Sequence, residues 1–568
     1  MLAALRWPGL AMQREPLRTA DERWAGALAW LLASVLLVFL AWPLASILVK
    51  AVQGPDGRLV GLDQLWALVA ETRLRAALWN SVGLALVSSA IVLPLALGFA
   101  FALTRSRLWG LPLLRWLALS PLLAPSLMPA ISLVYLFGNQ GLLKSWLGSA
   151  SIYGPLGIVM GEVFYTFPHA LLILVTSLAL ADQRLYEAAE TLGAGRLRRF
   201  VTITLPGARY GLVSAAMVVF TLVVTDFGVP KVIGGQTQVL ALEAYKQVIG
   251  QQNFSKGAVI GLMLLLPALL SVVVERRVAR RQVAAISGRS VAYQPPSNLW
   301  RDGLLALFCA ATVTFLLAML GVAVAASFIK LWPYQLELTL AHYRFDDVDG
   351  GGWAAFVNSL RLSACTALAG TTLVFASAYL TGKLNVPRLP ALLIRTLALL
   401  PMAVPGLVLG LGYIFCFNHP ANPLHALYGS MALMVMATIV HFYTTAYLTV
   451  GTALAQMAPE IEAVGRSLRR AWWTSCWRIT LPIAAPALLD AARFFFVSSM
   501  TTVSAVIFLY TPDTPLASVA VLAMDDAGDT AAAAAMATLI LASSLLSTLG
   551  FGALGAVLQR RTQAWRRT

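Results

Sequence analysis

Residues 187–206 read EAAETLGAGRLRRFVTITLP, and this stretch decides how the rest of the chain is interpreted. The helix-favouring Glu-Ala-Ala start, followed by Gly193 and the closing Leu205-Pro206, predicts two short helices around a turn. Gly193 permits a positive φ or the close approach of a partner backbone, and Pro206 is expected to end the second helix. Apolar runs flank the segment on both sides, so it is predicted to be a polar loop between two membrane spans.

The composition supports a membrane protein along the whole chain. Of 568 residues, 59% are hydrophobic and only 12% are charged, and the mean hydropathy is +0.77. These values exclude a soluble domain, a disordered chain and a peripheral protein. The apolar runs are long and continuous, whereas a β-barrel would alternate in segments of about ten residues. We predict twelve helical spans near residues 24–49, 77–104, 113–138, 154–182, 208–230, 257–274, 303–329, 354–382, 391–418, 426–454, 484–510 and 531–557.

Short sequence landmarks recur in the two sets of six spans. Asn80-Ser81 recurs as Asn358-Ser359, and Leu205-Pro206 recurs as Leu481-Pro482, with offsets of 278 and 276 residues. The order and direction are the same, which predicts two parallel homologous halves with a pathway at their interface. The predicted fold is therefore all-α and polytopic, with about 12 transmembrane helices. The predicted units are a first half at residues 1–274, a basic cytoplasmic linker at 275–302 and a second half at 303–568.

The chain carries 41 Lys and Arg residues against 25 Asp and Glu residues, a net charge of +16. The basic residues lie between apolar spans and concentrate in alternate loops, as the positive-inside rule requires, so we expect no nucleic-acid partner. The same bias places both termini in the cytoplasm. The four cysteines are far apart, and no cluster of ligands predicts a metal site.

The segment near residues 183–206 resembles the EAA loop of binding-protein-dependent ABC importer permeases, which have the type I, MetI-like fold. The resemblance rests on the spacing from Glu-Ala-Ala to Gly and on the closing Leu-Pro, and it implies a short helix that docks into a groove of an ATPase subunit. A second, degenerate copy lies near residues 459–482; counted back from Leu481-Pro482, its Glu stands one residue early and Arg469 replaces the Gly. The residues that the resemblance assigns to ATPase docking are Glu187, Ala188, Ala189, Gly193, Glu462, Ala463 and Gly465.

Two such loops in one chain imply two copies of an ABC ATPase, a periplasmic solute-binding protein and a location in the bacterial inner membrane. The sequence has no phosphate-binding loop; Gly382-Lys383 lacks the earlier Gly of that motif. We therefore expect that this chain is not an enzyme and binds no cofactor, and that ATP and Mg are held by the separate ATPase. A secondary transporter of the major facilitator type is disfavoured, because the loop at residues 105–110 lacks an acidic residue. A membrane enzyme is disfavoured because no cluster of acids or histidines faces one cavity.

Four segments resemble the permeases of 2-aminoethylphosphonate importers: 225–235 (TDFGVPKVIGG), 245–254 (YKQVIGQQNF), 500–510 (MTTVSAVIFLY) and 525–529 (DDAGD). Fused ferric-iron permeases share the two-half architecture and a related Asp-Phe-Gly stretch, so ferric iron or another small solute is the alternative substrate. Lys231 and Lys246 are candidates for attracting a phosphonate or contacting the binding protein, or else ordinary loop charges. Asp226 is a candidate gate residue or a helix-terminus group.

Prolines break the third and ninth predicted spans at matching places. Pro121 and Pro125 recur as Pro401 and Pro405, 280 residues later. Discontinuous helices at corresponding positions of two halves point to the translocation pathway. A kink that only shapes the fold is the competing interpretation.

Overall fold

The computed structural model covers the full chain. The residues it describes are 20–54, 58–61, 66–67, 69–107, 110–285, 291, 293–458, 460–468 and 470–562.

The described residues form a helical bundle in which ten helical stretches are long and apolar enough to cross a membrane. The fold class predicted from the sequence is confirmed. In the first half these helices are α1 (Ala20–Leu36), continued by η1 (Leu37–Ala41) and α2 (Trp42–Ala51), then α4 (Thr72–Arg105), α7 (Pro155–Ala179), α10 (Leu205–Thr225) and α13 (Phe254–Ala285). In the second half they are α14 (Leu299–Phe328), α15 (Gly352–Lys383), α18 (Met431–Ala455), α21 (Leu481–Thr501) and α23 (Thr530–Thr562).

The third and ninth predicted spans are broken helices rather than continuous ones. The chain at 113–138 divides into α5 (Leu111–Ala118), η2 (Ser120–Leu123) and α6 (Met128–Phe137), and no part of it qualifies as a span. The chain at 391–418 divides into α16 (Arg388–Leu399), η8 (Pro401–Ala403) and α17 (Gly406–Phe417), bent by 116°. Counting this bent pair raises the total to eleven, not the predicted twelve. Each break falls at the paired prolines, which cannot donate the helical hydrogen bond.

The shorter elements lie at the ends of the long helices. Between them are α8 (Gln183–Thr191), α9 (Arg196–Arg199), η4 (Phe200–Thr204), α11 (Gly228–Ile233), α12 (Leu240–Tyr245), η5 (Lys246–Gly250), α19 (Glu460–Ser467), α20 (Trp472–Ser475), η10 (Cys476–Thr480) and α22 (Ala517–Ala527). Single 3-10 turns are η3 (Lys144–Leu147), η6 (Ala341–Tyr343), η7 (Phe345–Asp347) and η9 (His425–Leu427). A two-stranded antiparallel hairpin, β1 (Ile329–Leu331) and β2 (Gln335–Leu338), pairs Ile329 with Leu338.

The Asn-Ser landmark has the same structural role in both halves. In the first half, Ser81 Oγ accepts from the Leu240 N–H at 3.0 Å, at the start of α12. In the second half, Ser359 Oγ accepts from the Ala517 N–H at 2.8 Å, at the start of α22. Helix N-termini leave backbone N–H groups without partners, and a hydroxyl from another helix satisfies one of them. The sequence repeat is therefore also a repeat of contacts.

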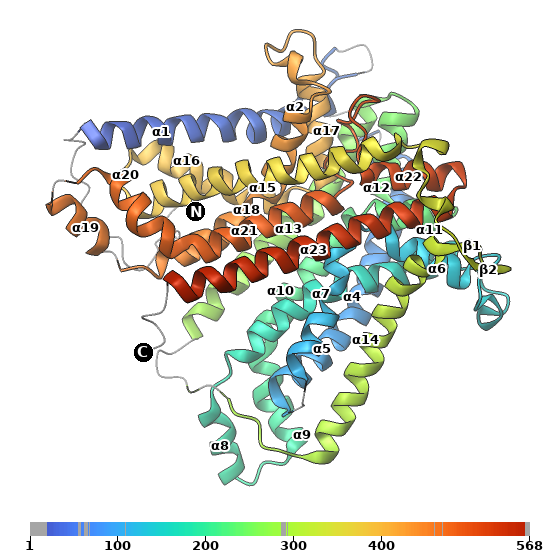
Figure 1. The fold of residues 1–568 in the computed structure, drawn as a ribbon, viewed down its shortest axis with the longest axis horizontal. Coiled ribbons are helices and arrows are strands. Elements are labelled where there is room, and N and C mark those ends of the chain that lie inside the picture. The colour runs from blue at the N-terminus through green and yellow to red at the C-terminus, as the bar shows by residue number, and fades with distance from the viewer. Residues whose placement is uncertain are drawn as a thin grey trace.

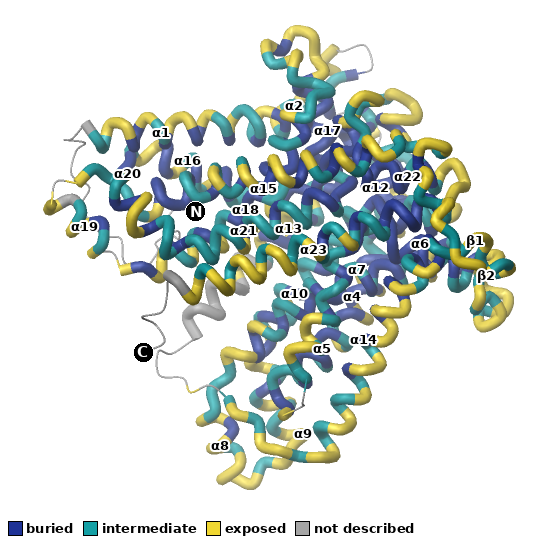
Figure 2. Tube along the Cα trace, in the orientation of Figure 1, coloured by how far each residue is buried: buried dark blue, intermediate teal, exposed yellow. Residues whose placement is uncertain are grey.

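The first helix of each half packs on the opposite half. Tyr413 of α17 donates to the Phe39 carbonyl in η1 at 2.6 Å, and a side chain at Gly412 would collide with the Pro43 carbonyl of α2. Likewise α14 packs along α4, α5 and α6 of the first half. Figure 1 shows the two bundles diverging toward α8 and α19 and meeting near α17, α12 and α22. Figure 2 shows buried residues concentrated at that meeting point.

The connection between the halves is shorter than the predicted linker. The helix α13 continues to Ala285, beyond the predicted boundary at 274. The residues described between the halves, 291 and 293–298, have no regular structure and lead directly into α14.

Candidate coupling and translocation site

The first candidate coupling segment is a short helix with caps at both ends. The carboxylate of Asp182 accepts from the Arg184 N–H at 3.1 Å and caps the start of α8. After the helix ends, Gly193 has a φ of +71°, which L side chains rarely adopt. The two helices predicted around a turn at Gly193 are thus α8 and α9.

Large aliphatic side chains are exposed on this segment. Leu192 and Leu197 are 85% and 77% exposed. Glu187 and Ala188 are also exposed, and Glu187 accepts from the Gln183 side-chain amide at 3.1 Å. Ala189 is partly buried.

The helix after the turn does not stop at Pro206, contrary to the sequence prediction. The helical run from Arg196 to Thr225 is continuous, with η4 joining α9 to α10. Pro206 lies in the first turn of α10, directly after the π-helical turn η4. Proline is tolerated at this position although it lacks the N–H group of a helical hydrogen bond. The segment is therefore rigidly continuous with the fifth span.

The second copy has the same elements with different side chains. Its helix α19 is followed by α20, η10 and α21, 276 residues after their counterparts. Glu462 is only 7% exposed and lies at the position of buried Tyr186, whereas Ala463 lies at the position of Glu187 and is exposed. Gly465 has no positive φ; a side chain there would meet Ser475 Oγ at 2.6 Å. Leu468, the counterpart of Leu192, is 67% exposed.

A basic side chain contacts each of the helices α8 and α19 at matching positions in the two halves. This repeated contact was not predicted from the sequence. Arg105, the last residue of α4, lies 5.5 Å from the Tyr186 ring centroid. Lys383, the last residue of α15, lies 3.8 Å from the Glu462 carboxylate. The offset of 278 residues between Arg105 and Lys383 equals that of the Asn-Ser landmark. Extending the repeat from the landmarks to the ends of their helices would have found this pair.

In each half the broken span meets the end of the helix after the coupling segment. A side chain at Gly228 would meet Ser126 Oγ at 2.5 Å, just beyond Pro125. A side chain at Gly406, just beyond Pro405, would meet Ser504 Oγ at 2.5 Å. The breaks at Pro125 and Pro405 therefore lie beside the segments that follow α10 and α21, at matching places in the two halves.

Asp226 closes α10 and opens α11. Its carboxylate accepts from the Val229 N–H at 2.8 Å. Glu162 of α7 is fully buried, and neither of its carboxylate oxygens accepts a hydrogen bond from a donor. The Glu162 and Asp226 carboxyl groups interact with each other and with Tyr165. The end of the fifth span thus places the Asp226 carboxyl group beside the buried Glu162 of α7.

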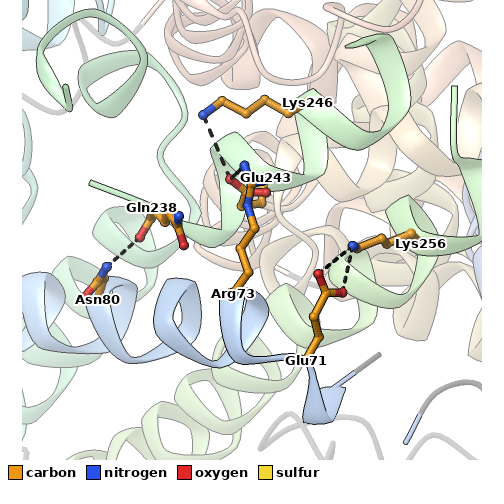
Figure 3. A network of polar contacts seen from close by, with 7 residues as sticks. All are labelled: Glu71, Arg73, Asn80, Gln238, Glu243, Lys246 and Lys256. Atoms are coloured by element: carbon orange, nitrogen blue, oxygen red, sulfur yellow. Dashed lines mark hydrogen bonds and ion pairs between the residues drawn. The ribbon is translucent and has the colours of Figure 1, made fainter. Parts of the chain in front are cut away.

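Both candidate lysines are engaged by carboxylates. Lys231 forms an ion pair with Asp526 of the second half at 2.9 Å. Lys246 lies 3.9 Å from Glu243, which also pairs with Arg73 at 3.0 Å. Figure 3 shows Arg73 and Lys246 reaching Glu243 from α4 and η5. Within the described part of the chain, no group of three or more His, Cys, Asp or Glu residues could hold a metal ion.

Two similar helical bundles, each with a short exposed helix at the same end, define a two-half membrane permease. Residues 90–283 and 370–563 each match the family described as the binding-protein-dependent transport system inner membrane component. The chain belongs to this family, one match falling in each half.

Individual relatives differ in the substrates that their names give. A ferric transport system permease protein of Actinobacillus pleuropneumoniae is 25% identical over 538 residues, 92% of this chain and 77% of the relative. A protein named as a 2-aminoethylphosphonate transport system permease in Salmonella paratyphi A is 26% identical over 236 residues, 41% of this chain and 87% of the relative. A crystal structure of a bacterial alginate ABC importer aligns with 45% of this chain and 96% of its own, at 15% identity and a TM-score of 0.37.

Proposed function

We propose that this chain forms the translocation pathway of an ATP-driven ABC importer and binds one ATPase subunit at each coupling segment. The observation that carries the proposal is the pair of exposed helices α8 and α19 at the same end of two repeated halves, each presenting an exposed leucine. Glu187, Ala188, Ala189 and Gly193 contribute to the first surface, and Ala463 is the exposed counterpart in the second. The ATPase supplies ATP, Mg and hydrolysis, and this chain supplies the pathway.

The coupling ends are assigned to the cytoplasm, together with both termini, in the bacterial inner membrane. The positive-inside distribution of Lys and Arg supports this orientation. A periplasmic binding protein then docks at the opposite face, which carries α12, α22 and the β1–β2 hairpin. Closure of the ATPases moves α8 and α19 together and opens the pathway outward, and hydrolysis resets it inward.

We propose ferric iron as the substrate, ahead of the 2-aminoethylphosphonate suggested by short sequence segments. The relatives named for ferric transport match most of this chain, including one of Haemophilus influenzae that covers 86% of it. 2-Aminoethylphosphonate remains the second candidate on the four matching segments.

The test is uptake by cells that carry or lack the gene, with radiolabelled ferric iron and labelled 2-aminoethylphosphonate measured in parallel. Gene-dependent iron uptake that stops on ATP depletion supports the substrate assignment. Phosphonate uptake instead would replace iron and keep the importer. A chain that copurifies with no ATPase would contradict the importer itself.

A further inference from the structure

The segment that joins the two halves lies along the first coupling helix. The Gln183 N–H donates to the Val291 carbonyl at 2.9 Å, and the Val291 N–H donates to the Asp182 carboxylate at 3.2 Å. The Gln294 N–H donates to the Gln183 side-chain carbonyl at 3.0 Å. These bonds hold the start of α8 and leave its exposed leucine-bearing end free for a partner. We call residues 291 and 293–298 the strap.

A cation and two aromatic rings lock the strap to the membrane helices. The Tyr293 ring lies 4.4 Å from the Tyr186 ring, and the Arg105 guanidinium lies 4.4 Å from the Tyr293 centroid. Arg105 is only 3% exposed and donates to the Leu178 carbonyl near the end of α7 at 2.9 Å. Cation–π contacts strengthen when they are desolvated. Burial also raises the pKa of Tyr293, so its phenol stays neutral.

The other end of the strap is fixed to α14. Asn298 caps α14 by accepting from the Arg301 N–H at 2.9 Å, and the Arg301 guanidinium donates to the Pro296 carbonyl at 2.6 Å. The helix α14 then packs along α5, η2 and α6, the broken third span. A displacement of α8 therefore has two routes inward: through α9 and η4 into α10, and through the strap and α14 to the broken span.

The second half has an ion pair and a cavity at the same place. Where Arg105 stacks on two rings, Lys383 and Glu462 form a 3.8 Å ion pair. Beside them is a cavity of about 430 Å³, whose lining includes Asp21, Tyr379 and Trp472. The Trp472 indole N–H donates to the Asp21 carbonyl at 3.1 Å, which brings the start of α1 to this site.

We propose that Arg105 and Tyr293 are positioning residues that make the strap a second transmission arm from coupling helix α8 to the broken third span. The inference rests on the proposed docking of an ATPase at α8. For this transmission the strap stays bound to α8, so that the strap and α8 move as one rigid body.

The test uses the full chain with its ATPase and binding protein in proteoliposomes, and compares transport with ATP hydrolysed. Tyr293→Ala keeps the ATPase bound and active, and transport per ATP falls at least about fivefold, the lower end of typical coupling between sites. Tyr293→Phe retains the ring and restores the ratio. Trp24→Ala, which removes an aromatic ring that is 68% exposed on α1, leaves it unchanged. An unchanged ratio in Tyr293→Ala would overturn the proposal.

A crosslink distinguishes two possibilities: that the strap stays bound to α8 during transport, or that it must detach from α8. In a Cys365→Ser background, which removes the exposed free cysteine, Gln183→Cys and Gln294→Cys are joined by a short bifunctional reagent. We expect transport to be retained after crosslinking, because the strap stays bound to α8 throughout. Loss of transport on crosslinking would contradict the proposed transmission through the strap. Failure of the parent chain to bind the ATPase would instead contradict the proposed function, so the two failures are distinguishable.

Discussion

Gly193 combines a backbone conformation that favours glycine with a place on the proposed ATPase-docking surface. Its φ of +71° is compatible with glycine, and no other atom lies within 4 Å of the position that a Cβ would occupy, so Gly193→Ala is strained without colliding. The left-handed conformation costs other residues about 1 kcal/mol. We expect Gly193→Ala to weaken ATPase binding about fivefold, and Gly193→Trp to abolish it by adding bulk at the surface. Pull-down of the ATPase measures both.

The matched control for this glycine is Gly451→Ala. Gly451 lies in the interior of α18, has open space around it and has no positive φ. Alanine is the better helix former, so binding and transport stay at the parent level. Equal loss in both variants would show that the turn at Gly193 has no specific role.

The ion pair between Lys231 and Asp526 joins the two halves by a contact of 2.9 Å, with side chains 21% and 49% exposed. Partly exposed pairs contribute about 0.5–1 kcal/mol. We expect Lys231→Met to raise ATP hydrolysis without substrate about two- to fivefold, because separation of the halves becomes easier. The exchange of both charges, Lys231→Asp with Asp526→Lys, restores the parent rate. Lys256→Met breaks the 2.7 Å ion pair with Glu71 inside the first half and serves as the neutral control.

Single residues show how far the sequence could predict the site. The pattern at 187–193 predicted α8 and its terminal glycine because capping and turn chemistry are local. The weaker pattern at Glu462 predicted the register of α19 but not that this carboxylate is buried against Lys383. Which face of a short helix turns inward depends on contacts with residues 79 positions away, here between 383 and 462, and these are not local.

At the scale of elements, the paired prolines decide whether the third and ninth predicted spans form continuous, straight helices. Their positions predicted discontinuity, but the apolar composition led to one continuous span in each place. A proline removes a hydrogen bond from the helix without making the segment less apolar. The sequence therefore located both breaks, while the 116° bend between α16 and α17 depends on packing against α2 and α18.

We expect the double variant Pro401→Ala, Pro405→Ala to extend α16 toward α17 and to abolish transport while the protein is still inserted. Alanine restores the missing N–H and favours helix, and straightening moves α17 away from its hydrogen bond between Tyr413 and Phe39. Uptake by membranes with matched protein content measures the loss. Pro267→Ala is the control, since Pro267 lies within the continuous helix α13. Transport at the parent level in the double variant would assign the break to folding alone.

At the scale of the whole molecule, the two halves could be recognised from sequence but their exchange of first helices could not. The landmarks Asn80-Ser81 and Asn358-Ser359 lie within the repeated contacts, so they report the repeat directly. Helices α1 and α14 carry no landmark, and an apolar helix packs equally well on either half by composition. Their placement follows from shape, such as the close approach of Gly412 to Pro43.

This exchange predicts that the two halves assemble without a covalent connection. Residues 1–288 and 289–568, coexpressed as separate chains, should copurify and transport, because α1 and α2 pack on the second half, α14 packs on the first, and the strap stays with the second. Starting the second chain at Leu299 removes the strap and leaves α14. That pair should copurify equally well and yet lose transport per ATP at least about fivefold, as Tyr293→Ala does. Halves that fail to copurify in either pair would show that the linker, and not the exchanged helices, holds the permease together.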